Sequence, residues 1–291
     1  MASAQFNTAA EGQQATDDYC LYIFPFSIYS IMARATLAFG QAAAASATAK
    51  PLSVGLKLVN LHREENISEA YLIEINDKGQ VPALTGGALS SPLTDSLDIS
   101  FFFCQHYPSL LPEKQTPIIK QLLQKLHQIQ VLSLSVPSKE DRAEGVPCPT
   151  VDALVAGTEI SPKYRDTLQI KQKYHKETQE NALTDDNVHL AEKQAKALFV
   201  KVDKIISTPA DKSGALPKWI FGDAVGPTVL DAHCTALIAR LMDCGRHDLI
   251  PGRLQQYAHS VMASPGWQSV THGRSTMWDV SVGHVHLLKD L

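Results

Sequence analysis

Hydroxyl side chains gather directly after a short apolar segment near the start of the sequence. Ser27, Tyr29 and Ser30 follow residues 20–24, which we expect to form a buried strand that Pro25 ends. A helix is expected to begin at Ser27 or Tyr29, so each hydroxyl lies near a helix N-terminus, where an anion is favoured. A hydroxyl in that position can donate a hydrogen bond to a thiolate, or can serve only as a helix cap.

A second candidate site lies in residues 76–84, NDKGQVPAL, where a turn is followed by a proline at the start of a strand. Proline is tolerated there if its missing N–H is not needed, or if the preceding peptide bond is cis. With a cis bond before Pro82, the backbone N–H and C=O groups of Val81 can face outward and pair with a small peptide. A trans proline at a strand edge is the alternative.

Thr94, Asp95 and Ser96 come just before another expected helix. Thr94 is expected to cap that helix, with Asp95 placed favourably for the helix dipole. The same carboxylate, hydroxyl and free N–H groups can hold the amino and carboxylate groups of an amino acid together. Capping and binding are compatible.

The elements that must position these residues alternate over the first hundred residues. Strands are expected at residues 20–24, 54–59, 81–84 and 88–93, the last two forming a hairpin around Gly86-Gly87. Helices are expected at residues 27–39, 64–75 and 94–107, with Gly40 ending the first. This order predicts an α/β, thioredoxin-like N-terminal domain over residues 19–110.

The strand signal disappears after residue 108, which predicts an all-α C-terminal domain over residues 113–280. Its helices are expected at residues 112–134, 164–180, 186–207, 228–244, 251–263 and 266–277. Two stretches are expected to be irregular: the alanine-rich residues 41–50, interpreted as a surface insertion, and the proline-rich residues 135–162, interpreted as a long loop.

Together these motifs resemble those of the cytosolic glutathione transferases. The resemblance rests on Pro25-Phe26-Ser27, on residues 76–84 and on LTDS at residues 93–96. Residues 222–231, GDAVGPTVLD, are similar to the family's buried capping box, Ser/Thr-x-x-Asp. The family usually has Asn-Pro where this chain has Asn76-Asp77, and Glu-Ser at residues 95–96. The similarity covers residues 19–110 and 216–270, and residues 135–180 match no common pattern.

The resemblance implies glutathione as the bound co-substrate and assigns it a set of residues. Ser27 would be the catalytic hydroxyl of a serine-type enzyme, with Tyr29 and Ser30 as alternatives. Val81 would bind the cysteinyl backbone of glutathione, with Pro82 supplying the cis bond after it. Asp95 and Ser96 would bind the γ-glutamyl end. Lys78 and Gln80 would bind the glycine end. The insertions resemble those of fungal transferases encoded with secondary-metabolite pathways.

The implied activity is attack of the glutathione thiolate on a hydrophobic electrophile held against the helical domain. Cis/trans isomerisation of an alkene, by thiolate addition and elimination, needs the same activated thiol and is the alternative within enzymes. A glutathione-binding module without catalysis is the alternative outside them. The resemblance also implies a homodimer.

Composition excludes several other classes of protein. The chain of 291 residues has a net charge of −4 and 44% hydrophobic residues, so it lacks the basic field expected of a nucleic-acid or anionic-membrane binder. Its five cysteines form no CxxC pair, which favours a reduced, cytoplasmic protein. His284 and His286 are interpreted as a solvated tail, so no metal site is expected.

Overall fold

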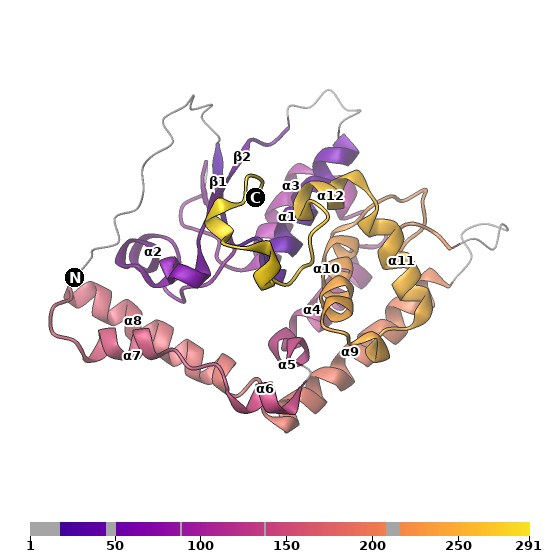
Figure 1. The fold of residues 1–291 in the computed structure, drawn as a ribbon. Helices are drawn as coiled ribbons and strands as arrows, with labels where there is room; N and C mark the ends of the chain where they lie inside the picture. The colour runs from indigo at the N-terminus through magenta and orange to yellow at the C-terminus, as the bar shows by residue number, and fades with distance from the viewer. Residues whose placement is uncertain (1–17, 45–50, 88, 137, 208–215) are drawn as a thin grey trace.

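A small mixed sheet near the amino end of the chain positions the candidate residues (Figure 1). The computed structural model describes residues 18–44, 51–87, 89–136, 138–207 and 216–291. The strands are β1 (Tyr19–Ile23), β2 (Val54–Leu58) and β3 (Ala83–Gly86), in the order β2-β1-β3. The central strand β1 pairs parallel with β2 and antiparallel with β3.

The expected hairpin partner of β3 does not form a strand. Within the described residues, its pairing is reduced to a single bridge between Leu84 and Leu93. Pro92 has no N–H to offer a ladder, which explains why pairing does not extend through residues 89–93. The bridge still brings the chain leading to Asp95 alongside β3.

Helix α1 (Ile28–Ala44) is longer than predicted. Gly40 lies inside it and not after its end, because the following Gln41 and alanines are good helix formers. Gly40 is buried where the helix meets Tyr107, and a Cβ built there would lie 2.6 Å from carbons of the Tyr107 ring. The glycine therefore permits close packing. Of the expected insertion, residues 45–50 lie outside the described part of the chain.

Changing Gly40 to alanine is expected to destabilise the protein by about 1–3 kcal/mol, because the added methyl group overpacks a fixed ring. The Tyr107 hydroxyl accepts a hydrogen bond from the Leu52 N–H at 3.0 Å, which holds the ring in place. Urea denaturation measures the change. Gly252→Ala is the matched control, since a Cβ at Gly252 meets nothing within 4 Å. Equal unfolding midpoints for the two variants would contradict the packing argument.

Two further helices complete the N-terminal half. Helix α2 (Glu69–Glu74) is shorter than the predicted residues 64–75, because two 3-10 turns at Leu61–Arg63 and Glu65–Ile67 precede it. The Ser68 hydroxyl caps α2 by accepting from the Tyr71 N–H at 3.4 Å. Helix α3 (Ser96–His106) begins directly after Asp95.

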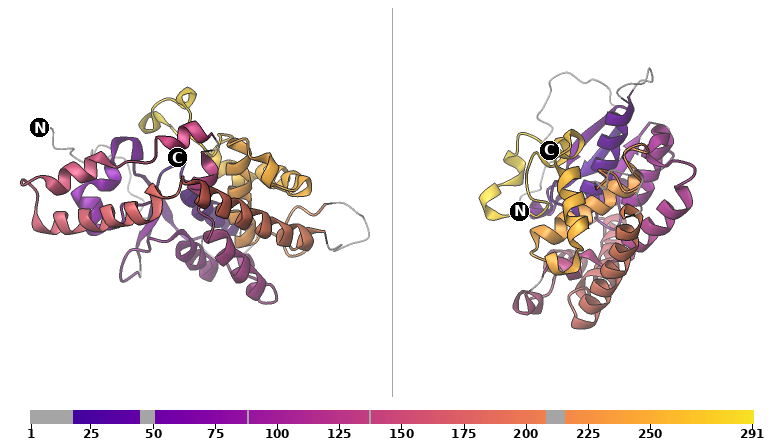
Figure 2. Two further views of the ribbon diagram at one scale, coloured as in Figure 1. Left: turned by 90° about the horizontal axis from the view of Figure 1, so that it is seen from below. Right: turned by 90° about the vertical axis from the view of Figure 1, so that its right-hand side faces the viewer.

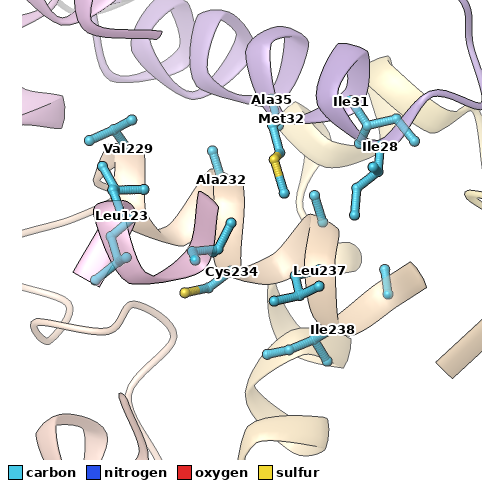
Figure 3. Close-up of a cluster of buried hydrophobic side chains, with 14 of the residues drawn as sticks. Ile28, Ile31, Met32, Ala35, Leu123, Val229, Ala232, Cys234, Leu237 and Ile238 are labelled. Carbon is cyan, nitrogen blue, oxygen red and sulfur yellow. The ribbon is translucent and has the colours of Figure 1, made fainter. Parts of the chain in front are cut away.

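The second half of the chain is helical throughout its described parts. The helices are α4 (Thr116–His127), α5 (Val131–Ser135), α6 (Lys139–Ala143), α7 (Pro149–Ala156), α8 (Pro162–His175), α9 (Asp185–Ile206), α10 (Val229–Asp243), α11 (Gly252–Met262) and α12 (Pro265–Thr271). Helix α10 is buried from Val229 to Leu241 and packs its apolar side chains against α1, as Figure 3 shows.

The predicted loop at residues 135–162 is wrong, because this stretch contains α6 and α7. Two of its prolines begin helices: Pro149 and Pro162 lie in the first turns of α7 and α8, where a missing N–H costs nothing. Ser138 caps α6 by accepting from the Asp141 N–H at 3.0 Å. The single helix predicted over residues 112–134 is also divided, into α4 and α5.

Helices α7 and α8 form a hairpin that extends to the N-terminal half and lies beside α2 (Figures 1 and 2). The Tyr164 hydroxyl donates to the Ile67 carbonyl at 2.6 Å. Tyr174 lies on the same helix as Tyr164, and the Lys78 ammonium group is 5.7 Å from the centre of the Tyr174 ring. The hairpin therefore borders the segment that contains Lys78 and Gln80.

The carboxyl-terminal segment also returns to the sheet (Figure 1). The helix predicted over residues 266–277 ends at Thr271, and the chain continues through 3-10 turns at Val280–Val282 and Val285–Leu287. Val285 is buried against a cluster that includes Phe24, Phe26, Val59, Tyr71 and Val81.

Candidate functional site

The turn after β1 places Ser27 at the start of α1. The Ser27 N–H donates to the Phe24 carbonyl at 2.9 Å, and the Ser27 carbonyl accepts from the Ile31 N–H at 2.9 Å. The Ser27 hydroxyl oxygen accepts from the Ser30 N–H at 3.4 Å. Its own proton has no acceptor among the described residues, and the side chain is half-buried. Ser27 therefore has a proton to donate to a ligand.

The two alternative hydroxyls lie in different surroundings. The Ser30 side chain is fully buried, and its oxygen accepts from the Phe24 N–H at 3.4 Å. Tyr29 is half-buried, and its hydroxyl makes no hydrogen bond in the described part of the chain. Burial raises the pKa of Tyr29 to about 12, with a smaller contribution from Tyr174, so the phenol stays protonated at neutral pH.

The Val81–Pro82 peptide bond is cis, as one of the two sequence interpretations requires. Because Tyr22 pairs with Ala83, the sheet places Val81 and Pro82 next to the end of β1. The Gln80 carbonyl, which accepts from the Tyr71 hydroxyl at 2.6 Å, fixes the loop before them. Neither backbone group of Val81 makes a hydrogen bond within the described ranges. Both are available to a peptide.

The turn at residues 76–79 presents Lys78 to solvent and leaves Gln80 half-buried. Its shape is set by Asn76, which is buried and accepts from the Lys78 N–H at 3.0 Å. The Asn76 amide also donates to the Gln80 carbonyl at 3.0 Å. The two residues predicted to hold the glycine end of glutathione thus share one rigid turn.

The cap of α3 is Asp95 and not Thr94, which corrects the sequence prediction. One carboxylate oxygen of Asp95 accepts from the N–H groups of Leu97 and Asp98, at 2.8 and 3.2 Å. Both residues are good caps by type, and the chain enters the helix one position later than expected. The other Asp95 oxygen has no hydrogen bond to a described residue. Asp95 is exposed, whereas Ser96 is buried.

Arg240, on α10, is a site residue that the sequence prediction missed. Its buried guanidinium donates to the carbonyls of Phe26 and Thr276, both at 2.7 Å. It therefore fixes the residue before Ser27 and ties the turn to the carboxyl-terminal segment. A basic residue in a helix that is buried from Val229 to Leu241 was the available signal.

Two histidines, also missed, lie on the helical side of the site. His127 ends α4, and its ring centre is 6.2 Å from that of Tyr29. Its Nε2 atom is 2.9 Å from Nδ1 of the fully buried His233. The Asp95 carboxylate acts on both His127 and Tyr29 electrostatically, which indicates that these three groups are close.

The structure therefore brings together most of the predicted residues at one end of the sheet. Ser27 follows β1, Val81 and Pro82 precede β3, and Asp95 and Ser96 begin α3. No group of three or more His, Cys, Asp or Glu side chains suited to a metal ion occurs in the described ranges. Among those residues, no helix combines the length and apolar character needed to cross a membrane.

The backbone arrangement is similar to that of several solved structures. Glutathione transferase F7 from Populus trichocarpa matches with a TM-score of 0.53 and 15% identity, over 88% of this chain and 98% of that chain. This chain has the glutathione transferase fold. Glutathione transferase Omega 3C from Trametes versicolor matches this fold with a TM-score of 0.50 and 16% identity, over 92% of this chain and 89% of that one.

A third structure with the glutathione transferase fold, glutathione S-transferase I, was determined with lactoylglutathione bound. It matches with a TM-score of 0.50 and 18% identity, over 88% of this chain and 99% of that one. No protein-family model matches the sequence, and no curated protein matches it. At these identities the similarity establishes the fold.

Proposed function

We propose that this protein binds glutathione and activates its thiol for attack on a hydrophobic electrophile. The observation that carries the proposal is the convergence of unused polar groups from three residues in a chain of this fold. These are the Ser27 hydroxyl proton, the backbone N–H and C=O of Val81, and one carboxylate oxygen of Asp95. They match a thiolate, a peptide backbone and an amino group, which are the recognisable parts of glutathione.

Each end of the peptide is assigned to one element. Val81, fixed by the adjoining Pro82, pairs with the cysteinyl backbone. Asp95 takes the γ-glutamyl amino group, while Ser96 and the first turn of α3 take its carboxylate, where the helix dipole favours an anion. Lys78 and Gln80 hold the glycine end, because they lie in the loop that leads from α2 to Val81.

Ser27 stabilises the thiolate by donating its free proton. A thiol with an ordinary pKa of about 8.5 is roughly 3% ionised at pH 7. Lowering that pKa to about 6.5 makes roughly three quarters of it thiolate, a gain of about 25-fold. The N-terminus of α1 contributes in the same direction. Ser30 is the weakest of the three candidates because its hydroxyl is fully buried.

The electrophile is expected to lie against the helical side of the site, between His127 of α4 and Tyr174 of α8. We propose a secondary-metabolite substrate for a serine-type enzyme that acts as a cytoplasmic homodimer. Conjugation and isomerisation are separated by product analysis: conjugation consumes glutathione, and isomerisation returns it.

Asp95→Asn is expected to weaken glutathione binding on the order of ten- to a hundred-fold, because a charge-assisted bond to the amino group is lost. The amide oxygen of the variant can still accept from Leu97 and Asp98, so α3 stays capped. Calorimetry measures the affinity. Asp98→Asn removes an equal charge one turn away and is the control. Wild-type affinity in Asp95→Asn would remove Asp95 from the site.

A further inference from the structure

Three polar side chains from three helices form a buried hydrogen-bonded chain beside the site. The Ser100 hydroxyl of α3 donates to the Ser96 carbonyl at 2.7 Å and lies 2.9 Å from Nε2 of His233 on α10. His233 Nδ1 is in turn 2.9 Å from Nε2 of His127 on α4. Ser100 and His233 are both fully buried. His127 is half-buried and forms the open end of the chain.

We assign the direction of these hydrogen bonds from the proton count. With the one hydroxyl proton of Ser100 donated to Ser96, Ser100 accepts from Nε2–H of His233 and from the Thr36 hydroxyl, 3.3 Å away. A neutral His233 then has only a lone pair at Nδ1 and accepts from Nε2–H of His127. Consequently His127, when neutral, carries its own lone pair at Nδ1. Burial lowers the pKa of both histidines, which supports the neutral forms at pH 7.

His127 lies beside the start of α1, with its ring centre 6.2 Å from that of Tyr29. The two nitrogens of an imidazole diverge, so Nδ1 points away from His233, and it has no hydrogen bond to any described residue. The groups that face His127 are the Tyr29 phenol of α1, Asp95 at the cap of α3, and His233. Tyr174 of α8 raises the pKa of Tyr29 electrostatically and Arg240 of α10 lowers it, both less than burial raises it.

We propose that His127 is the proton acceptor for the glutathione thiol, held in the required tautomer by His233 and Ser100. This inference rests on the proposed function. The S–H bond breaks, its electron pair stays on sulfur, and the proton moves to Nδ1 of His127. Sulfur then bonds to the electrophilic carbon, and the imidazolium returns the proton to the atom that gains negative charge. His127 is thus a catalytic residue, and His233 is a positioning residue.

His127→Gln is expected to slow turnover at pH 7 on the order of ten-fold, within the roughly 30-fold that full ionisation of a thiol with an ordinary pKa of about 8.5 can gain. The glutamine can still donate to His233, so the fold is preserved. Glutathione affinity, measured by calorimetry, should stay that of the wild type. Activity should recover toward roughly pH 9, where the thiol ionises without a protein base. His189→Gln, an exposed position on α9, is the control.

The ultraviolet absorbance of the bound thiolate follows the ionisation itself: wild-type protein should show thiolate at pH 7, whereas His127→Gln should show it only toward pH 9. Equal thiolate absorbance at pH 7, or wild-type turnover in His127→Gln, would overturn the proposal. Loss of glutathione affinity in that variant would make His127 a binding residue instead. Absence of glutathione binding by the wild-type protein would refute the proposed function itself, and the inference with it.

Variants of His233 test separately whether this residue orients His127. His233→Gln can accept from His127 and donate to Ser100, so it should keep the pH–rate profile of the wild type. His233→Leu removes the acceptor and lets His127 change tautomer, which should slow turnover by up to about ten-fold. Identical pH–rate profiles for the two variants would show that the relay does not orient His127.

Discussion

Ser27→Ala is expected to slow turnover at pH 7 on the order of 20-fold, because the bound glutathione thiol loses the donor that stabilises its anion. Affinity should stay nearly intact, since Val81, Asp95 and Ser96 hold the peptide. The lost rate should return in part at high pH, where the thiol ionises unaided. A pH–rate profile, with the ultraviolet absorbance of the bound thiolate, measures the shift in thiol pKa.

Tyr29→Phe and Ser30→Ala are the matched controls for Ser27. The structure gives Tyr29 a protonated phenol without a described partner, so it is the stronger competitor, whereas Ser30 is closed off in the core. A wild-type profile in Ser27→Ala, together with a lost thiolate signal in Tyr29→Phe, would transfer the role to the phenol. If all three variants retain the thiolate absorbance, the thiolate is stabilised by backbone N–H groups at the start of α1 instead.

Asp231→Ala is expected to destabilise the protein by about 3–5 kcal/mol, which is far more than a surface cap contributes. The carboxylate is fully buried at the start of α10, where Thr228 completes the capping box. It accepts from the N–H groups of Ile220 and Thr228 and from the Tyr257 hydroxyl, each at 2.8 Å. The Thr228 hydroxyl also donates to it at 2.6 Å. Alanine leaves several buried donors unpaired.

Urea denaturation measures the loss, and Asp223→Ala is its control. Asp223 is exposed and accepts from the Lys218 N–H at 2.8 Å, so its removal should cost about 1 kcal/mol or less. Folded Asp231→Ala protein at low temperature should bind glutathione like the wild type. Similar losses of stability in the two variants would show that the buried hydrogen bonds of Asp231 contribute little to the free energy of unfolding.

Prediction from the sequence succeeded where the signal is local. The dense apolar run at residues 20–24 marks β1, and Thr228 followed by Asp231 marks the start of α10, because a strand and a cap are each specified within a few residues. The same reasoning misassigned the cap of α3. Thr94 and Asp95 are both suitable, and only the path of the chain decides between them.

The missed features depend on contacts between distant residues. His127 and His233 are 106 positions apart, and Arg240 reaches Phe26 across 214 positions, so no local pattern reveals either pair. Helix α7 was missed for another reason: proline disfavours a helix interior but suits its first turn, and the sequence does not say which applies. As a result, the hairpin of α7 and α8 that borders the site was not predicted.

The position of Val285 affects how the protein is made. The aromatic cluster around Phe24, Phe26 and Tyr71 is completed only when Val285 packs against it. A ribosome adds Val285 about 260 residues after Phe24, a delay on the order of 10–50 s at ordinary rates of translation. Until Val285 is added, the aromatic cluster lacks this packing partner, so the last part of the chain to be synthesised helps to complete the core of the amino-terminal half.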